Sequence, residues 1–136
     1  MTVQATWLGQ AGFLVSWEDG DGRRRSLAID PYLSDSLAGK YRGTLFPHVR
    51  MQPAPFSPDG LPPLVAVLCT HRHTDHMDPG PLQPLFRHDD AAVLVAPRAE
   101  AAEASSRSGL DASRMRLLDA GEELQFGEVR VRAVPA

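Results

Sequence analysis

Three of the five histidines in this chain lie close together, in the sequence HRHTDH. In an extended segment the side chains of His71 and His73 point to the same side, with Cα atoms roughly 6–7 Å apart, so both imidazoles can converge on one cation. Asp75 and His76 follow a turn and can bind a second cation beside the first. Imidazole nitrogens and a carboxylate are the ligands expected for zinc, and manganese or iron are also compatible. A chance grouping of surface histidines would rarely produce this spacing, so the sequence predicts a metal site.

Two neighbours of the cluster could also bind a metal, and both have a simpler interpretation. Asp78 precedes Pro79, which predicts an N-cap for the next helix. Cys69 ends an apolar segment, where a cysteine is usually a small core residue.

The cluster follows LVAVLCT, an apolar run typical of a strand buried on both faces. Open α/β sheets usually place their sites at the carboxyl ends of such strands. Downstream, the pattern alternates between predicted helices and buried strands. These elements are a helix over 79–88, a strand over 91–97, an alanine-rich helix over 98–109 closed by Gly109, and a strand over 115–119.

The first thirty residues predict an antiparallel hairpin and a strand that ends at Asp30, with Trp7 and Phe13 in the core. A second hairpin is expected around 126–127. The order of elements therefore predicts an α/β fold of the α+β type, with a mixed sheet and helices over at least one face.

The proline-rich segment 31–63 shows little periodicity apart from a short predicted helix over 34–42. A connection of this length usually has a function, for instance as a lid or binding loop. His48, Arg42 and Arg50 could bind an anionic group such as a phosphate. The simpler interpretation is that they are solvated loop residues.

Composition excludes several classes of function. A chain of 136 residues with net charge −3, whose one basic cluster, Arg23 to Arg25, is predicted at a solvated hairpin tip, is not expected to bind nucleic acid. No run approaches the ~18 apolar residues of a membrane span, and the N-terminus lacks the features of a signal peptide. A lone cysteine fits a reducing compartment. We expect a cytoplasmic protein with no membrane partner.

The pattern H-x-H-x-D-H after a VLCT strand resembles the signature of the metallo-β-lactamase superfamily of binuclear metallohydrolases. The segments WLGQAGFLV and LAIDPYLSDS are similar to the branch around L-ascorbate-6-phosphate lactonase. The resemblance covers essentially the whole chain, and it implies the N-terminal half of an αββα sandwich.

The resemblance also implies roles for individual residues. His71 and His73 would bind the first of two zinc ions, and Asp75 and His76 the second. A hydroxide held between the ions would be the nucleophile, and Asp75 would orient it and relay its proton. Asp30 would brace the metal-binding loop by hydrogen bonds. Asp30 could also simply form an Asp-Pro turn, and the two roles are compatible.

The family's second half supplies a further histidine to the first metal, a bridging aspartate and a last histidine to the second metal. No histidine follows His88 in this chain. We therefore expect residues 1–136 to be one domain truncated before its second half, and to be impaired alone. A partner chain or a second copy could complete the fold, covering an apolar sheet face that would otherwise be exposed.

The predicted function is that of a metal-dependent hydrolase acting on a lactone, ester or phosphoester, with a phosphorylated sugar lactone as the favoured small-molecule substrate. A phosphodiesterase of the same superfamily is the alternative within the enzyme class. A non-catalytic metal-binding or interaction module is the alternative outside it.

Overall fold

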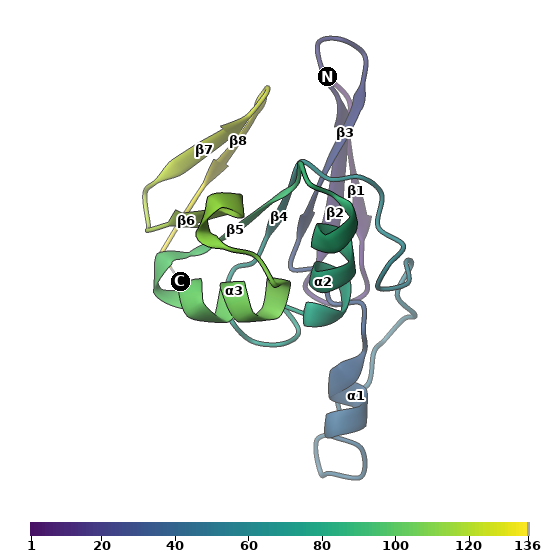
Figure 1. The fold of residues 1–136 in the computed structure, drawn as a ribbon. Helices are drawn as coiled ribbons and strands as arrows, with labels where there is room; N and C mark the ends of the chain where they lie inside the picture. Colours follow the sequence, from purple (N-terminus) through teal and green to yellow (C-terminus); the bar gives the residue numbers. More distant parts are fainter. Residues whose placement is uncertain (136) are drawn as a thin grey trace.

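The strands form one six-stranded mixed sheet and a separate two-stranded hairpin (Figure 1). The computed structural model describes residues 1–135, so Ala136, which the expected domain and second hairpin include, lies outside the described residues. The large sheet has the order β1-β2-β3-β4-β5-β6, antiparallel from β1 to β3 and parallel from β3 to β6. Its strands are β1 (Val3–Trp7), β2 (Phe13–Glu18), β3 (Arg24–Ile29), β4 (Ala66–Leu68), β5 (Val93–Pro97) and β6 (Met115–Leu118). The hairpin consists of β7 (Glu123–Phe126) and β8 (Val129–Arg132). The predicted mixed α/β sheet is confirmed.

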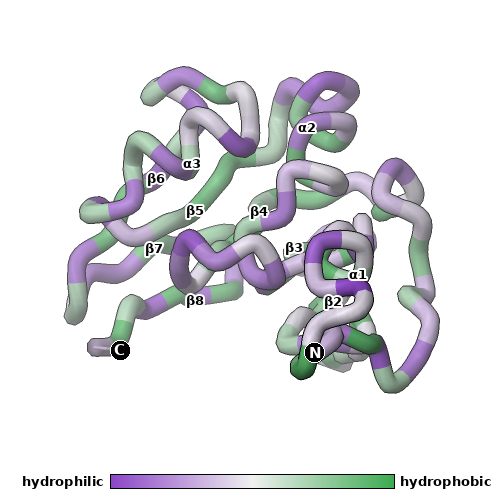
Figure 2. Tube along the Cα trace, turned by 90° about the horizontal axis from the view of Figure 1, so that it is seen from below, coloured by the Kyte–Doolittle hydropathy of each residue, from purple (hydrophilic) through white to green (hydrophobic). Residues whose placement is uncertain are grey.

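Two helices cover one face of the sheet, and the β7–β8 hairpin lies against the other face (Figure 2). The helices are α1 (Ser36–Lys40), α2 (Pro79–His88) and α3 (Ala101–Ser108), with short 3₁₀ turns η1 (Arg98–Glu100) and η2 (Ala112–Arg114). Helices α2 and α3 pack on the sheet, whereas α1 belongs to the long β3–β4 connection and lies away from it (Figure 1). None of the helices within residues 1–135 has the length and apolar character needed to span a membrane.

The central parallel strands are buried on both faces, as their continuous apolar sequences predict. Val67 and Leu94 face the core beneath α2 and α3. Ala66 and Val95 face the opposite side, where they form a second cluster with Trp17. The loop 70–77, in which the metal ligands are predicted, therefore extends from the middle of a sheet whose central strands are packed on both faces.

Both predicted helix ends are confirmed. The Asp78 side chain accepts a hydrogen bond from the backbone N–H of Gly80 at 3.0 Å, so Asp78 is the N-cap of α2. Helix α3 ends at Gly109, whose φ of 76° is in the left-handed region that glycine adopts without strain.

The prediction of Trp7 and Phe13 as core residues is wrong, because each is 40% exposed. The two are cross-strand partners at the β1–β2 end of the sheet. By strand alternation Phe13 shares its face with Val15, on the side opposite the helices. The β7–β8 hairpin packs against the other end of this face (Figure 2). The two aromatic rings therefore stay partly in solvent.

Gly12 holds the β1–β2 turn against the end of β3. A Cβ at this position would lie 2.4 Å from the carbonyl oxygen of Asp30 and 3.0 Å from that of Ile29. The backbone N–H of Leu8 donates to the Gly12 carbonyl at 2.9 Å and closes the turn. Only glycine allows this approach, so the turn fixes the position at which β3 delivers Asp30.

We predict that Gly12→Ala lowers the free energy of unfolding by about 1–3 kcal/mol, because the new methyl group must displace backbone atoms. Denaturant unfolding of the purified chain measures the change. Gly39→Ala is the matched control, since a Cβ at Gly39 meets no atom within 4 Å. A Gly12→Ala chain with the unfolding midpoint of the unmodified chain would show that the turn is not constrained in this way.

Candidate metal centre

Residues Thr70 to Met77 form the predicted metal-binding loop, which connects β4 to α2 at the carboxyl end of the parallel strands (Figure 1). The backbone N–H groups of His76 and Met77 both donate to the carbonyl of His73, at 2.9 and 2.8 Å. This tight turn brings Asp75 and His76 back toward the first two histidines. The ring centroids of His71 and His76 are 4.0 Å apart, and those of His71 and His73 are 4.7 Å apart.

Asp30 joins β3 to this loop through a carboxylate that is only 4% exposed. Its Oδ1 accepts from the backbone N–H of Thr70 at 2.8 Å, and its Oδ2 accepts from the Thr70 hydroxyl at 2.7 Å. Oδ2 also lies 2.8 Å from Nδ1 of His76. The predicted strand 64–70 ends early, at Leu68, because Thr70 bonds to this side chain and not to a neighbouring strand. These are the hydrogen bonds that a bracing role requires, and the role itself stays a prediction.

The same carboxylate sets the tautomers of two histidines. An ionised carboxylate can only accept, so Nδ1 of His76 carries a proton, and in the neutral ring Nε2 keeps its lone pair. The single hydroxyl proton of Thr70 goes to Asp30, so the hydroxyl oxygen accepts from Nδ1 of His71 at 2.9 Å. Nε2 of His71 is then also free to bind a metal. A hydrogen bond on the other ring nitrogen is the usual arrangement of a metal-binding histidine.

The spacing of His71 and His73 fits one metal ion. Nε2 of His71 accepts a hydrogen bond from Nδ1 of His73 at 3.1 Å, so a metal ion between the two nitrogens would replace this proton. Two nitrogens at the usual zinc distance and a tetrahedral angle lie about 3.3–3.4 Å apart, so a small movement admits the ion. Burial, followed by the nearby His76 and His73, lowers the pKa of His71, which favours the neutral form that binds metals.

Asp75 and His76 form the second pair, with Oδ2 of Asp75 3.7 Å from Nε2 of His76. Within residues 1–135, no group of three or more histidine, cysteine, aspartate or glutamate side chains is arranged to hold a metal ion. Imidazole nitrogens and a carboxylate oxygen are ligands that zinc accepts, so the four side chains fit zinc as two pairs of ligands.

Two neighbours of the loop have structural roles. Asp78 is 1% exposed, and besides capping α2 it accepts from the backbone N–H groups of Leu33 and Ser34 and from the Ser34 hydroxyl. Cys69 is buried in the core beneath the helices, and burial raises the pKa of its thiol. The interpretation of Asp78 as an N-cap and of Cys69 as a core residue is confirmed.

His48 is a residue that sequence reasoning underrated. The long connection brings its Nε2 to 4.0 Å from Oδ2 of Asp75. Its ring packs edge-on against the ring of the fully buried Tyr32, with centroids 5.6 Å apart. No local pattern marks this placement, because the proline-rich segment has no periodicity from which to infer contacts.

Arg50 explains how His48 is held. Its guanidinium donates to the carbonyl of Tyr32 at 2.8 Å and to the carbonyl of Leu8. A Cβ on Gly9 would lie 2.6 Å from Nη2 of Arg50, and the φ of Gly9 is 90°, so glycine leaves room for this clamp. Arg50 is therefore a structural brace, whereas Arg42 is exposed.

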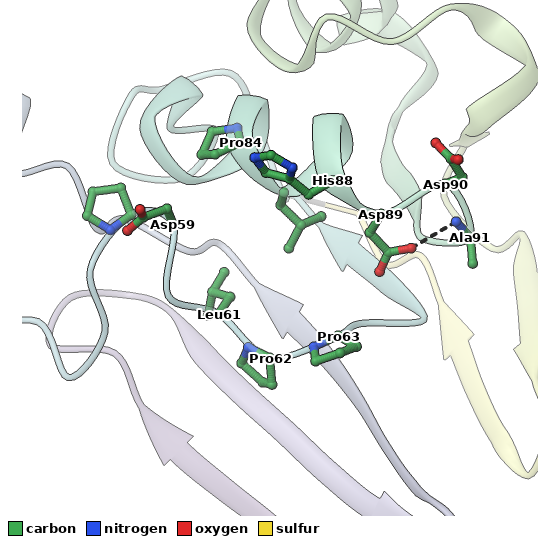
Figure 3. Close-up of a pocket in the computed structure, with 11 residues that line it drawn as sticks. Asp59, Leu61, Pro62, Pro63, Pro84, His88, Asp89, Asp90 and Ala91 are labelled. Carbon is green, nitrogen blue, oxygen red and sulfur yellow. Dashed lines mark hydrogen bonds between the residues drawn. The ribbon is translucent and has the colours of Figure 1, made fainter.

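A separate pocket, of about 480 Å³, includes no residue of the metal-binding loop (Figure 3). Prolines and Leu61 line it together with Asp59, His88 and Asp90. His88 is exposed at the end of α2, as predicted. Because this pocket shares no residue with the loop, His88 and Asp90 are useful control positions.

Comparison with known proteins gives two findings. A family model described as "Beta-lactamase superfamily domain" matches residues 25–136, which include Asp30 and the whole metal-binding loop. A solved structure, the crystal structure of a metallo beta lactamase from Hirschia baltica, is similar with 15% sequence identity and a TM-score of 0.40. The match covers 96% of this chain and 59% of that chain. No curated protein matches this sequence.

We predict that Asp30→Asn weakens zinc binding by about 10–100-fold, because an amide has one acceptor oxygen and cannot accept all three hydrogen bonds that Thr70 and His76 donate to the carboxylate. The free energy of unfolding should fall by about 1–3 kcal/mol as a buried donor loses its partner. Competition with a chelator measures the affinity. Asp90→Asn, at an exposed position, is the control. A folded Asp30→Asn chain that binds zinc as tightly as the unmodified chain would contradict the bracing role.

Proposed function

Because the chain belongs to the beta-lactamase superfamily, we propose that it carries the metal-binding loop of a metal-dependent hydrolase. One observation carries the proposal. The Asp30 carboxylate bonds directly to His76 and, through Thr70, to His71. It thereby leaves Nε2 of each neutral ring unprotonated, close to the other proposed ligand of its pair. A structural cluster of histidines has no need of such an arrangement, whereas a metal site does.

The proposed ligand pairs are His71 with His73 for the first ion and Asp75 with His76 for the second. Zinc is favoured by the donor set, and manganese or iron are compatible with it. When bound, such ions polarise the scissile group and bring the pKa of a water molecule toward neutrality. Asp75 lines the pocket beside the loop, where its carboxylate can orient a water molecule and relay its proton.

We propose a lactone, ester or phosphoester as the substrate, with a phosphorylated sugar lactone favoured. Support for the lactone comes from the resemblance of WLGQAGFLV and LAIDPYLSDS to the ascorbate-6-phosphate lactonase branch. The structure also gives these segments a scaffolding role, because Gly9 admits Arg50 and Gly12 abuts Asp30. A phosphodiesterase reaction of the same superfamily is the alternative substrate class.

We further propose that residues 1–136 form one domain and need donors from outside this chain for full activity. Catalytic zinc usually has three protein ligands and a water, and each proposed pair supplies two. A second copy, a partner chain or additional polypeptide would provide the rest. The two-donor pairs also support the second candidate function, a non-catalytic metal-binding or interaction module.

We predict that replacing both His71 and His73 with alanine removes zinc from the first position. The loss of affinity should exceed the roughly 10–100-fold typical of changes to groups that only support a ligand. Metal analysis after gel filtration in the presence of zinc gives the content of each chain. His88→Ala is the control, because that histidine is exposed and outside the loop. Unchanged zinc content in the double variant would refute the site assignment.

We predict that the purified 136-residue chain, loaded with zinc, hydrolyses a p-nitrophenyl ester or bis(p-nitrophenyl) phosphate poorly. The physical reason is incomplete coordination at both positions. Release of p-nitrophenol, followed by absorbance, provides the measurement. Full hydrolase activity from this chain without a partner would overturn the need for outside donors.

A further inference from the structure

A pocket of about 660 Å³ lies between the metal-binding loop and the long β3–β4 connection. His73 and Asp75 line it from the metal-binding loop, and Lys40, Phe46 and His48 line it from the connection. Helix α1 and the following residues project from the sheet as a separate arm (Figure 1). The connection therefore forms one wall of the space into which the proposed site opens.

His48 is held in this wall by a contact to its ring and by an anchored neighbour in the chain. Tyr32 supports its ring edge-on, and Arg50, two residues later, bonds to the carbonyls of Tyr32 and Leu8. The ring of Tyr32 lies 5.2 Å from the guanidinium of Arg50, which adds a cation–π contact. A loop residue with this support has a defined place relative to Asp75.

The two ring nitrogens of His48 have different surroundings. Nδ1 is buried and has no hydrogen-bond partner among the described residues. Nε2 lies 4.0 Å from Oδ2 of Asp75, which is too long for a hydrogen bond, so this carboxylate does not occupy Nε2 as a hydrogen-bond partner. The nearby carboxylate favours the N–H of a neutral imidazole on Nε2. His48 thus presents a donor beside the pocket.

The charge and apolar character of the connection indicate what this donor binds. Residues 36–58 contain three basic residues and no aspartate or glutamate, although the chain has a net charge of −3. Lys40 and Arg72 are exposed at the pocket, whereas Arg107 is already bonded to Glu103. Phe46 is 81% exposed and offers an apolar surface beside the positive charge. The combination suits a ligand with an anionic group next to an aromatic or apolar group.

We propose that His48 is a substrate-binding residue, whose Nε2–H donates to an anionic oxygen of the substrate while Phe46 covers its apolar part. Lys40 adds a favourable charge at the same wall. The inference rests on the proposed function, because it assigns the pocket beside the metal-binding loop to that hydrolase's substrate. It assigns to His48 a role apart from the proposed metal ligands.

Phenylphosphonate is the probe, because it has an anionic phosphonate next to an aromatic ring and its P–C bond resists hydrolysis. Titration into the metal-free chain, followed by the histidine ring signals in NMR spectra, should shift the His48 signal. We predict that His48→Ala weakens binding by about tenfold or more, as expected for a lost hydrogen bond to a charged group. His48→Gln, whose amide can donate from a similar place, should keep most of the affinity, and His88→Ala should change nothing.

Equal affinity for phenylphosphonate in His48→Ala and the unmodified chain would overturn the proposal. The absence of any binding to the unmodified chain at millimolar concentrations of phenylphosphonate would overturn it as well. A second titration with zinc-loaded chain separates two sources of affinity. Binding that needs zinc and ignores His48 would place the anion on the metal, and would refute the role of His48 while leaving the proposed function intact. Binding that needs His48 in a chain that takes up no zinc would support His48 and refute the metal site.

Discussion

The buried carboxylate of Asp30 is the contact on which the rest of the site depends. It sits at the end of β3 with a φ of 45°, in the left-handed region that aspartate tolerates better than most residues. From there it bonds to the backbone and hydroxyl of Thr70 and to the ring of His76. One acceptor group thus ends two neighbouring strands and decides which nitrogens of two histidines carry protons. The hydrogen bonds of Asp30 therefore determine both the path of the loop and the nitrogens that the histidines offer to a metal.

Two further contacts hold the long connection around this centre. Asp78 caps α2 and also binds the backbone of Leu33 and Ser34, which ties the start of the connection to the helix after the metal-binding loop. Arg50 ties a later part of it to Leu8 and Tyr32. A chain segment with almost no regular secondary structure is therefore held by the buried Asp78 and the half-buried Arg50. Its place beside Asp75 follows from these bonds together with the packing of Leu33, Phe56 and Leu61 against the core.

Much of the fold follows from local sequence, because local chemistry decides it. The buried strands, the N-cap Asp78 and the helix end at Gly109 depend on residues within a few positions of one another, and the structure has all of them. The spacing of His71 and His73 likewise determines that their rings meet. The prediction that Trp7 and Phe13 are buried is wrong, because their burial depends on how far the distant β7–β8 hairpin extends over the sheet. The roles of His48 and Arg50 do not follow from the local sequence. Only tertiary contacts show that His48 faces Asp75 and that Arg50 bonds to the carbonyls of Tyr32 and Leu8.

The central claim is that Asp30 sets the tautomers of the metal-binding loop before any metal arrives. Long-range ¹H–¹⁵N correlation spectra of the histidine rings in the metal-free chain, at a pH where the rings are neutral, test it directly. The account predicts that His71 and His76 both carry their proton on Nδ1 and leave Nε2 bare. Protonation of either ring on Nε2 in the neutral form would contradict it.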